Sequence, residues 1–94
     1  MSSSGDVVAR RVRIHGRVQG VFFRDTCRRE AASHGVAGWV RNCSDGTVEA
    51  WFEGPPAAVE AMVVWAGRGP SRAEVANVDV DEAEPSGASG FGVR

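Results

Sequence analysis

The spacing of apolar residues in the first third of the chain predicts a strand followed by a helix. Apolar and polar residues alternate over residues 7–14, which is the period of a half-buried strand. Residues 16–21 break the alternation with two glycines and are expected to form a loop. Apolar residues at four-residue spacing then predict a helix that ends at His34, with Gly35 just beyond it. The expected inward residues are Val8, Val12 and Ile14 in the strand and Phe23, Cys27 and Ala31 in the helix.

The remaining chain predicts three more full strands, a second helix and a short last strand. The turn Ser44-Asp45-Gly46 indicates a hairpin, because Asp-Gly between two β segments favours a tight reversal. The segment Gly54-Pro55-Pro56 opens the second helix, since proline is tolerated in a first turn. The expected strands are residues 36–43, 47–53 and 73–82, with a short last strand at 91–93. The expected inward residues are Val48, Ala50 and Phe52 in the third strand, Val59, Met62, Val63 and Ala66 in the helix, and Ala76, Val78 and Val80 in the fourth strand.

This order of elements, β-α-β-β-α-β, predicts an α+β fold of the ferredoxin-like type. In it, an antiparallel sheet carries two helices on one face. The chain has 94 residues, enough for one domain. We expect that domain to span residues 7–94, after a disordered tail at residues 1–6. The fold hosts many functions and does not identify one.

Composition indicates a soluble cytoplasmic protein. Hydrophobic residues make up 43% and charged residues 24% of the chain. No apolar run approaches the roughly 20 residues that span a bilayer, and the first residues lack the features of a signal peptide. Cys27 and Cys43 do not form a Cys-x-x-Cys pair, so we expect no disulfide and no metal site from them.

The net charge of −1 hides an uneven distribution of charge along the chain. Residues 1–43 carry +5 and residues 44–94 carry −6. A basic first half suits capture of an anion, although most of its arginines are expected on solvated faces. Nucleic-acid binding is a weaker alternative. The three tryptophans, Trp39, Trp51 and Trp65, lack the pattern of an RNA-binding sheet and are expected to pack in the core or at its rim.

The segment Gly16-Arg17-Val18-Gln19-Gly20-Val21-Phe22-Phe23-Arg24 is the strongest candidate for chemistry. A loop that leaves a strand and enters a helix exposes backbone N–H groups beside the positive end of the helix dipole, which suits an anion. Glycines at 16 and 20 allow close approach of a ligand, and the guanidinium of Arg24 matches phosphate oxygens. The same pattern also fits a tight turn followed by a surface arginine.

Three polar residues near this loop each have two interpretations. Asn42 could have a catalytic role, but its residue type and position alone favour a hydrogen bond to the turn that follows it. His15 is expected to be solvated or hydrogen-bonded, with a general base as the alternative. Asp25 could steer Arg24, but we favour a role at the positive helix N-terminus.

Two stretches of the chain resemble the signatures of the acylphosphatase family. The first is Gly16-Arg-Val-Gln-Gly-Val-Phe-Phe-Arg24, and the second is Gly38-Trp-Val-Arg-Asn-Cys-Ser-Asp-Gly-Thr-Val-Glu49. Ala31 and Gly35 stand at the family's spacing between them. The resemblance covers roughly residues 8–94; Cys27, Cys43 and the Gly/Ser-rich segment 86–90 are its looser points.

The resemblance implies a metal-independent, cofactor-free enzyme that hydrolyses small acyl phosphates. It assigns phosphate binding to Arg17, Val18, Gln19, Gly20, Val21 and Arg24, and catalysis to Arg24 and Asn42. Asn42 would hold the attacking water. The expected partners are the acyl phosphate and inorganic phosphate as product and inhibitor, with no nucleic acid and no membrane. A free-standing monomer is expected; the alternative is a module that binds a phosphate without turnover.

Overall fold

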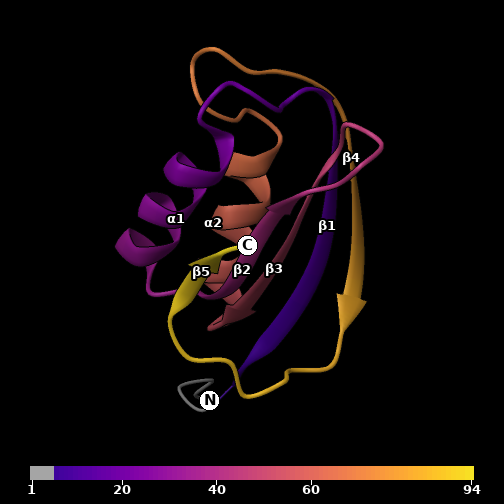
Figure 1. The fold of residues 1–94 in the computed structure, drawn as a ribbon. Helices are drawn as coiled ribbons and strands as arrows, with labels where there is room; N and C mark the ends of the chain where they lie inside the picture. Colours follow the sequence, from indigo (N-terminus) through magenta and orange to yellow (C-terminus); the bar gives the residue numbers. More distant parts are fainter. Residues whose placement is uncertain (1–5) are drawn as a thin grey trace.

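A computed structural model describes residues 6–94 of the chain, so the tail predicted at residues 1–6 lies outside it, apart from Asp6. Each expected element is present, with ends shifted by a few residues (Figure 1). In chain order they are β1 (Val8–Arg17), α1 (Phe23–His34), β2 (Ala37–Asn42), β3 (Val48–Gly54), α2 (Pro56–Ala66), β4 (Glu74–Ala83) and β5 (Phe91–Val93).

The five strands form one sheet in the order β4-β1-β3-β2-β5, and both helices lie on one face of it (Figure 1). The first four strands in that order pair antiparallel, which confirms the ferredoxin-like arrangement. The sheet is mixed and not wholly antiparallel, because the chain crosses from one edge to the other and enters β5 parallel to β2. None of the helices in residues 6–94 is long and apolar enough to cross a membrane.

The hydrophobic core fills the space between the helices and the sheet. Phe52 and Met62 are fully buried, and burial of each such side chain contributes about 1.5–3 kcal/mol. The Phe23 and Trp65 rings pack at 5.2 Å between α1 and α2. Trp65 thus joins the buried stripe of α2, in which Val63 is only half-buried. The cysteines are free, and burial raises the pKa of the Cys27 thiol within this core.

Strand β4 is where the expected core residues are wrong. Ala76 and Val80 are exposed and Val78 is half-buried, because α1 and α2 pack mainly on β1, β2, β3 and β5. Val80 pairs with the buried Val12 but lies beyond the cover of the helices. Ala76 is displaced by an irregularity in the β1–β4 pairing, and Val75 packs against the core instead.

That irregularity also lengthens β1 beyond its predicted end. The β1–β4 register shifts between His15 and Gly16, and pairing continues to Arg17. Gly16 has φ +126°, and a Cβ atom there would lie 2.2 Å from the carbonyl oxygen of Glu74. Only glycine fits so close to β4. The loop expected at 16–21 therefore begins at Val18, and its first end is held by the sheet.

The outer face of the sheet buries two acids among basic and aromatic residues. Arg41 donates to Glu49 with its Nε at 2.8 Å, and Arg11 and Arg13 lie 3.6–3.9 Å from the same carboxylate. Glu53 accepts hydrogen bonds from the indole of Trp51 and from the segment 86–88, which lies in the connection between β4 and β5. Burial alone would raise the pKa of Glu53, but these hydrogen bonds hold it at about 2.

Candidate active site

The loop between β1 and α1, residues 18–22, is anchored in the core and borders a pocket. Val18 and Val21 are buried, so their side chains hold the loop against the domain. Gly20 and Phe22 both have left-handed backbones, with φ +74° and +63°. Where right-handed and left-handed backbone conformations alternate along a chain, neighbouring N–H groups point toward a common centre. Such an arrangement, called a nest, binds anions. Phe22 occupies this region at a cost of roughly 1–2 kcal/mol.

The first turn of α1 leaves its N–H groups available to a ligand. Phe22 stands at the N-cap position and its side chain cannot accept a hydrogen bond. The first helical bond runs from the Thr26 N–H to the Phe22 carbonyl at 3.1 Å. The helix N–H groups before Thr26 have no helical acceptor, and the helix dipole adds positive potential there. The loop and the helix start therefore make one continuous anion site.

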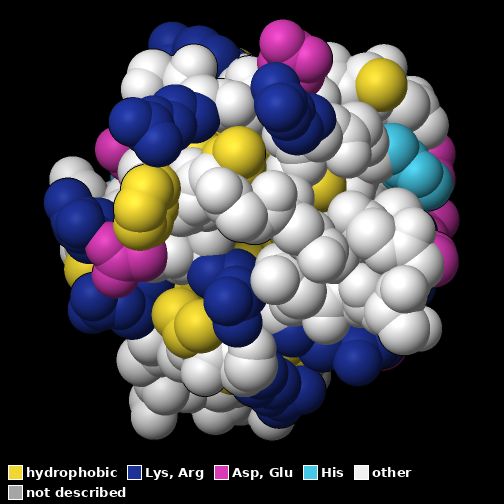
Figure 2. Space-filling view, turned by 45° about the horizontal axis from the view of Figure 1, so that its top comes forward, with side chains coloured by type: hydrophobic (Ala, Val, Ile, Leu, Met, Phe, Trp, Pro, Cys, Tyr) yellow, Lys and Arg dark blue, Asp and Glu magenta, His cyan; other side chains and the backbone are white. Residues whose placement is uncertain are grey.

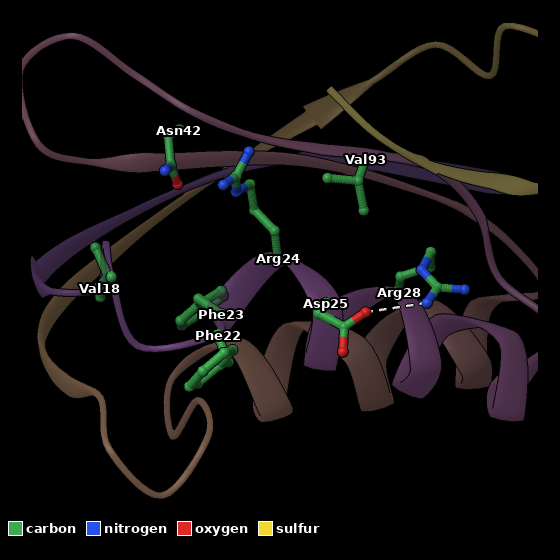
Figure 3. Close-up of a pocket in the computed structure, with 9 residues that line it drawn as sticks. Val18, Phe22, Phe23, Arg24, Asp25, Arg28, Asn42 and Val93 are labelled. Atoms are coloured by element: carbon green, nitrogen blue, oxygen red, sulfur yellow. Dashed lines mark hydrogen bonds and ion pairs between the residues drawn. The ribbon is translucent and has the colours of Figure 1, made fainter.

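Arg24 extends from this first turn toward the sheet. Figure 3 shows its guanidinium pointing across the pocket toward Asn42, at the end of β2. The Arg24 Nη1 donates a hydrogen bond to the backbone oxygen of Arg94, at 3.3 Å. This contact fixes the guanidinium between α1 and the strand β5, while its other N–H groups remain for a ligand.

Gln19 ties the loop to the β2–β3 hairpin. Its Nε2 donates to the carbonyl oxygens of Cys43 and Thr47, at 2.8 and 2.9 Å. The hairpin is itself closed by the Cys43 N–H, which donates to Thr47 at 2.8 Å. Asp45 accepts from the backbone N–H of Thr47 at 3.0 Å and from its hydroxyl at 2.6 Å. The position of Asn42 is thereby set relative to the loop.

A pocket of about 510 Å³ opens where these elements meet. Its lining residues are Val18, Gly20, Phe22, Phe23, Arg24, Asp25, Arg28, Asn42 and Val93. Figure 2 shows arginine side chains on this side of the molecule, with hydrophobic side chains exposed between them. The volume lies in the range of small-molecule sites.

The structure brings together four residues of the predicted site, Val18, Gly20, Arg24 and Asn42, in this one pocket. The other three do not line it with their side chains. Arg17 ends β1 and pairs with Glu74, Gln19 turns to the hairpin, and the Val21 side chain enters the core. The side chains of Gln19 and Val21 are engaged elsewhere, so a contact of these two with a phosphate would use their backbone N–H groups.

Specific contacts favour one interpretation for two of the three polar residues near the loop, His15 and Asp25. His15 bonds Asp79 at 2.9 Å and does not line the pocket, as the hydrogen-bonded interpretation predicts. Asp25 pairs with Arg28 at 3.0 Å and also with Arg29, and these hydrogen bonds lower its pKa. Asp25 forms no hydrogen bond or ion pair with Arg24, so the steering role finds no support.

Only one of the three tryptophans packs in the core as expected. Trp65 is buried, while Trp39 and Trp51 lie on the outer face of the sheet under arginine side chains. Trp39 has the guanidinium of Arg94 4.4 Å from its ring centroid.

Three features of the site had no local signal in the sequence. The side-chain bonds of Gln19, the pocket wall at Val93 and the contact of Arg94 with Arg24 all join segments far apart in the chain. The left-handed backbone of Phe22 could have been suspected only from the need for a second positive φ in an anion nest. Among the described residues, no three His, Cys, Asp or Glu side chains gather as a metal site.

Comparison with known proteins identifies a family whose members match most of this chain. Residues 10–93 match the family model described as Acylphosphatase. An acylphosphatase from Thermococcus kodakarensis is 56% identical over 82 residues, covering 87% of this chain and 90% of the relative. One from Haloarcula marismortui is 54% identical over 81 residues, covering 86% and 89%.

A solved structure of an acylphosphatase has the same fold as this chain. The structure of an acylphosphatase from Coxiella burnetii superimposes with a TM-score of 0.92 at 35% identity, covering the whole of both chains. Its likeness extends over every strand and helix that frames the pocket. This chain belongs to the acylphosphatase family.

Proposed function

We propose that this chain hydrolyses the carboxyl–phosphate bond of small acyl phosphates, giving a carboxylate and inorganic phosphate. One observation carries the proposal: Arg24 points from the anion-binding helix start toward Asn42, across a single pocket. Family membership supports the same reaction.

The phosphate binds in the loop and on Arg24. Backbone N–H groups from Arg17 to Val21 surround its oxygens, with the glycine at 20 allowing close approach. The guanidinium of Arg24 adds a planar pair of donors and a full positive charge. Both sets of donors are fixed before the substrate arrives, so they stabilise the charge of the transition state with little reorganisation.

Asn42 holds the water that attacks phosphorus. The water oxygen forms a bond to phosphorus as the bond from phosphorus to the acyl oxygen breaks, and the electron pair leaves on the carboxylate. The acid of that leaving group has a pKa near 4, by analogy with side-chain carboxyls, so it departs without protonation. The proton released by water passes to the phosphate or the solvent. Phosphoryl transfer of this kind depends on positioning and charge stabilisation, which these residues supply.

The proposal includes three expectations about the surroundings of the enzyme. It works as a monomer, it acts in the cytoplasm, and it needs neither a membrane nor a nucleic acid. Inorganic phosphate occupies the same loop and inhibits the reaction.

The test is hydrolysis of benzoyl phosphate by the purified chain in the presence of a chelator. We expect chelator-resistant turnover, with inorganic phosphate as a competitive inhibitor. Binding of phosphate without turnover would instead identify a binding module. Noncompetitive inhibition would place phosphate elsewhere. A steep loss of affinity for oligonucleotides with salt would support the nucleic-acid alternative.

A further inference from the structure

The pocket extends beyond what the phosphate group requires. Five of its lining residues do not belong to the predicted phosphate loop or to the water site. One of them, Phe23, is buried against Trp65, which leaves four: Phe22, Asp25, Arg28 and Val93. In Figure 3, Asn42 lies on one side of Arg24, and Val93 with the Asp25–Arg28 pair lies on the other. Phe22 lies at the helix start, on the far side of Phe23 from Asn42.

The direction of the reaction assigns this second region to the acyl group. In phosphoryl transfer, the attacking and leaving oxygens lie roughly in line with phosphorus. If the water is held at Asn42, the carboxylate must leave away from Asn42. The acyl group that it carries then enters the part of the pocket formed by Phe22, Val93 and the ion pair.

The chemistry of these walls favours an uncharged acyl group. Phe22 and Val93 are apolar and remain exposed, by 69% and 43%. The nearby charges are already satisfied, since Arg28 donates to the Asp25 carboxylate at 3.0 Å and Arg29 contacts the same group. A negatively charged acyl group would find no unpaired cation in this pair and would meet the carboxylate of Asp25.

Phe22 is the unusual residue of the four. Its backbone adopts φ +63°, which is the left-handed region that glycine and asparagine enter most easily. It is the only non-glycine residue with positive φ among those the structure describes. A bulky aromatic side chain is thus held in a strained conformation and left largely in solvent. Strain of this kind is concentrated at ligand sites, where it positions a contact group.

We propose that Phe22 is a specificity-determining residue that binds the acyl group and makes the enzyme prefer aromatic acyl phosphates. This inference rests on the proposed function, because it takes the direction of the leaving group from the water site at Asn42. The exposed ring offers a flat apolar surface, and an aromatic acyl group can pack against it edge-on or offset.

The experiment compares kcat/KM for benzoyl phosphate and acetyl phosphate in four proteins. They are the wild type, Phe22→Asn, Phe22→Leu and the control Val64→Ala. Asparagine tolerates the left-handed backbone and removes the ring, whereas leucine keeps an apolar surface. Val64 is 66% exposed on α2, similar to Phe22, and does not line the pocket.

We expect Phe22→Asn to lower the benzoyl-to-acetyl ratio by roughly three- to tenfold, the size of one aromatic contact. Phe22→Leu should give an intermediate ratio, and Val64→Ala the wild-type ratio. The Tm of Phe22→Asn should rise, because the backbone strain is relieved while little packing is lost. A residue that only supports the loop would lower kcat/KM for both substrates equally.

The outcomes of this experiment distinguish a failure of the Phe22 assignment from a failure of the proposed function. Wild-type turnover of both substrates with an unchanged ratio in Phe22→Asn would overturn the role of Phe22 and leave the enzyme assignment intact. An equal loss for both substrates would overturn it in favour of a loop-supporting role. No turnover of either substrate by the wild type would overturn the proposed function, and the acyl-group assignment with it.

Discussion

The side-chain nitrogen of Gln19 lies 2.8 Å from the carbonyl oxygen of Cys43, the residue directly after Asn42. This bond, together with the one to Thr47 at 2.9 Å, joins the loop proposed to bind phosphate to the strand end that carries Asn42, the residue proposed to hold the water. One amide side chain thus holds two parts of the candidate site, the loop after β1 and the end of β2, at a fixed spacing.

Gln19→Ala should therefore impair catalysis more than binding. Loss of the two bonds should destabilise the fold by about 1–3 kcal/mol and lower kcat by roughly tenfold or more, since small displacements of positioned groups are costly. Steady-state kinetics and urea unfolding measure the two effects. Asn77→Ala, which removes an exposed amide bond to Asp79, serves as the control. A stability loss with an unchanged kcat would show that the bridge is only structural.

Asn42→Ala should lower kcat by about 10²–10³ with little change in KM, because the water is placed for the chemical step. The isosteric Asn42→Asp should in addition raise KM, since its negative charge lies across the pocket from Arg24 and repels phosphate. Initial rates over a range of benzoyl phosphate concentrations separate these effects. An unchanged kcat in Asn42→Ala would remove the water-holding role.

Arg24→Ala should nearly abolish turnover, by at least about 10²–10³ in kcat/KM, because both binding and transition-state charge are lost. Arg24→Lys keeps the charge but loses the planar fork, so it should recover only part of the activity. Arg68→Ala, which removes an exposed arginine after α2, is the matched control. Competition by inorganic phosphate reports binding independently, and it should weaken in both Arg24 variants.

Glu53 should make stability depend on acid pH. Its pKa is about 2 in the fold, below its ordinary value of 4.5, so the folded state favours the charged form. The stabilisation is complete above about pH 4.5 and is lost as the pH falls through that value toward 2. Thermal unfolding between pH 2 and 7 should show this loss.

Glu53→Gln should be less stable at pH 7 and should show a flatter dependence in the same range. Its amide can replace only part of a carboxylate that accepts from three backbone N–H groups, and hydrogen bonds to charged groups are worth about 1.5–3 kcal/mol. Glu60→Gln, on the exposed side of α2, should behave as the wild type. An equally steep pH dependence in Glu53→Gln would assign the effect to other carboxyl groups.

Two glycines with positive φ should respond differently to alanine. At Gly46 a Cβ atom meets nothing within 4 Å, so Gly46→Ala should cost only the backbone strain of roughly 1–2 kcal/mol. At Gly16 the same atom would lie 2.2 Å from the Glu74 oxygen, so Gly16→Ala should cost clearly more. Denaturant unfolding of the two variants measures the difference. Equal losses of unfolding free energy in the two variants would show that β4 moves at little energetic cost to make room for a side chain at residue 16.

Local patterns were sufficient to predict most of the framework. The four-residue spacing from Phe23 to Ala31 and the cap at Gly35 defined α1, and Asp45-Gly46 identified the hairpin. These signals act through nearby residues, so they can be read along the chain. The buried acids at 49 and 53 differ, because their burial depends on arginines and a loop brought in from elsewhere.

The features that the hydrophobic pattern did not predict depend on how segments far apart in the chain pack and pair. Ala76 and Val80 have the alternation of inward residues, but cover by a helix depends on how α1 and α2 lie across the sheet. The parallel pairing of β5 with β2 likewise has no local signal. At the site, Arg24 and Asn42 were identifiable by motif, whereas the Val93 wall follows only from that pairing.

The contact between Arg24 and Arg94 spans 70 positions of the chain, and it ends on the residue after the three-residue strand β5. A contact between such distant segments must offset the entropy lost when the long loop between them closes. Catalytic turnover therefore reports whether β5 has docked in the fold and brought Arg94 to Arg24. A chain with both helices formed and β5 still undocked would keep most of its regular secondary structure and yet lack the Val93 wall of the pocket.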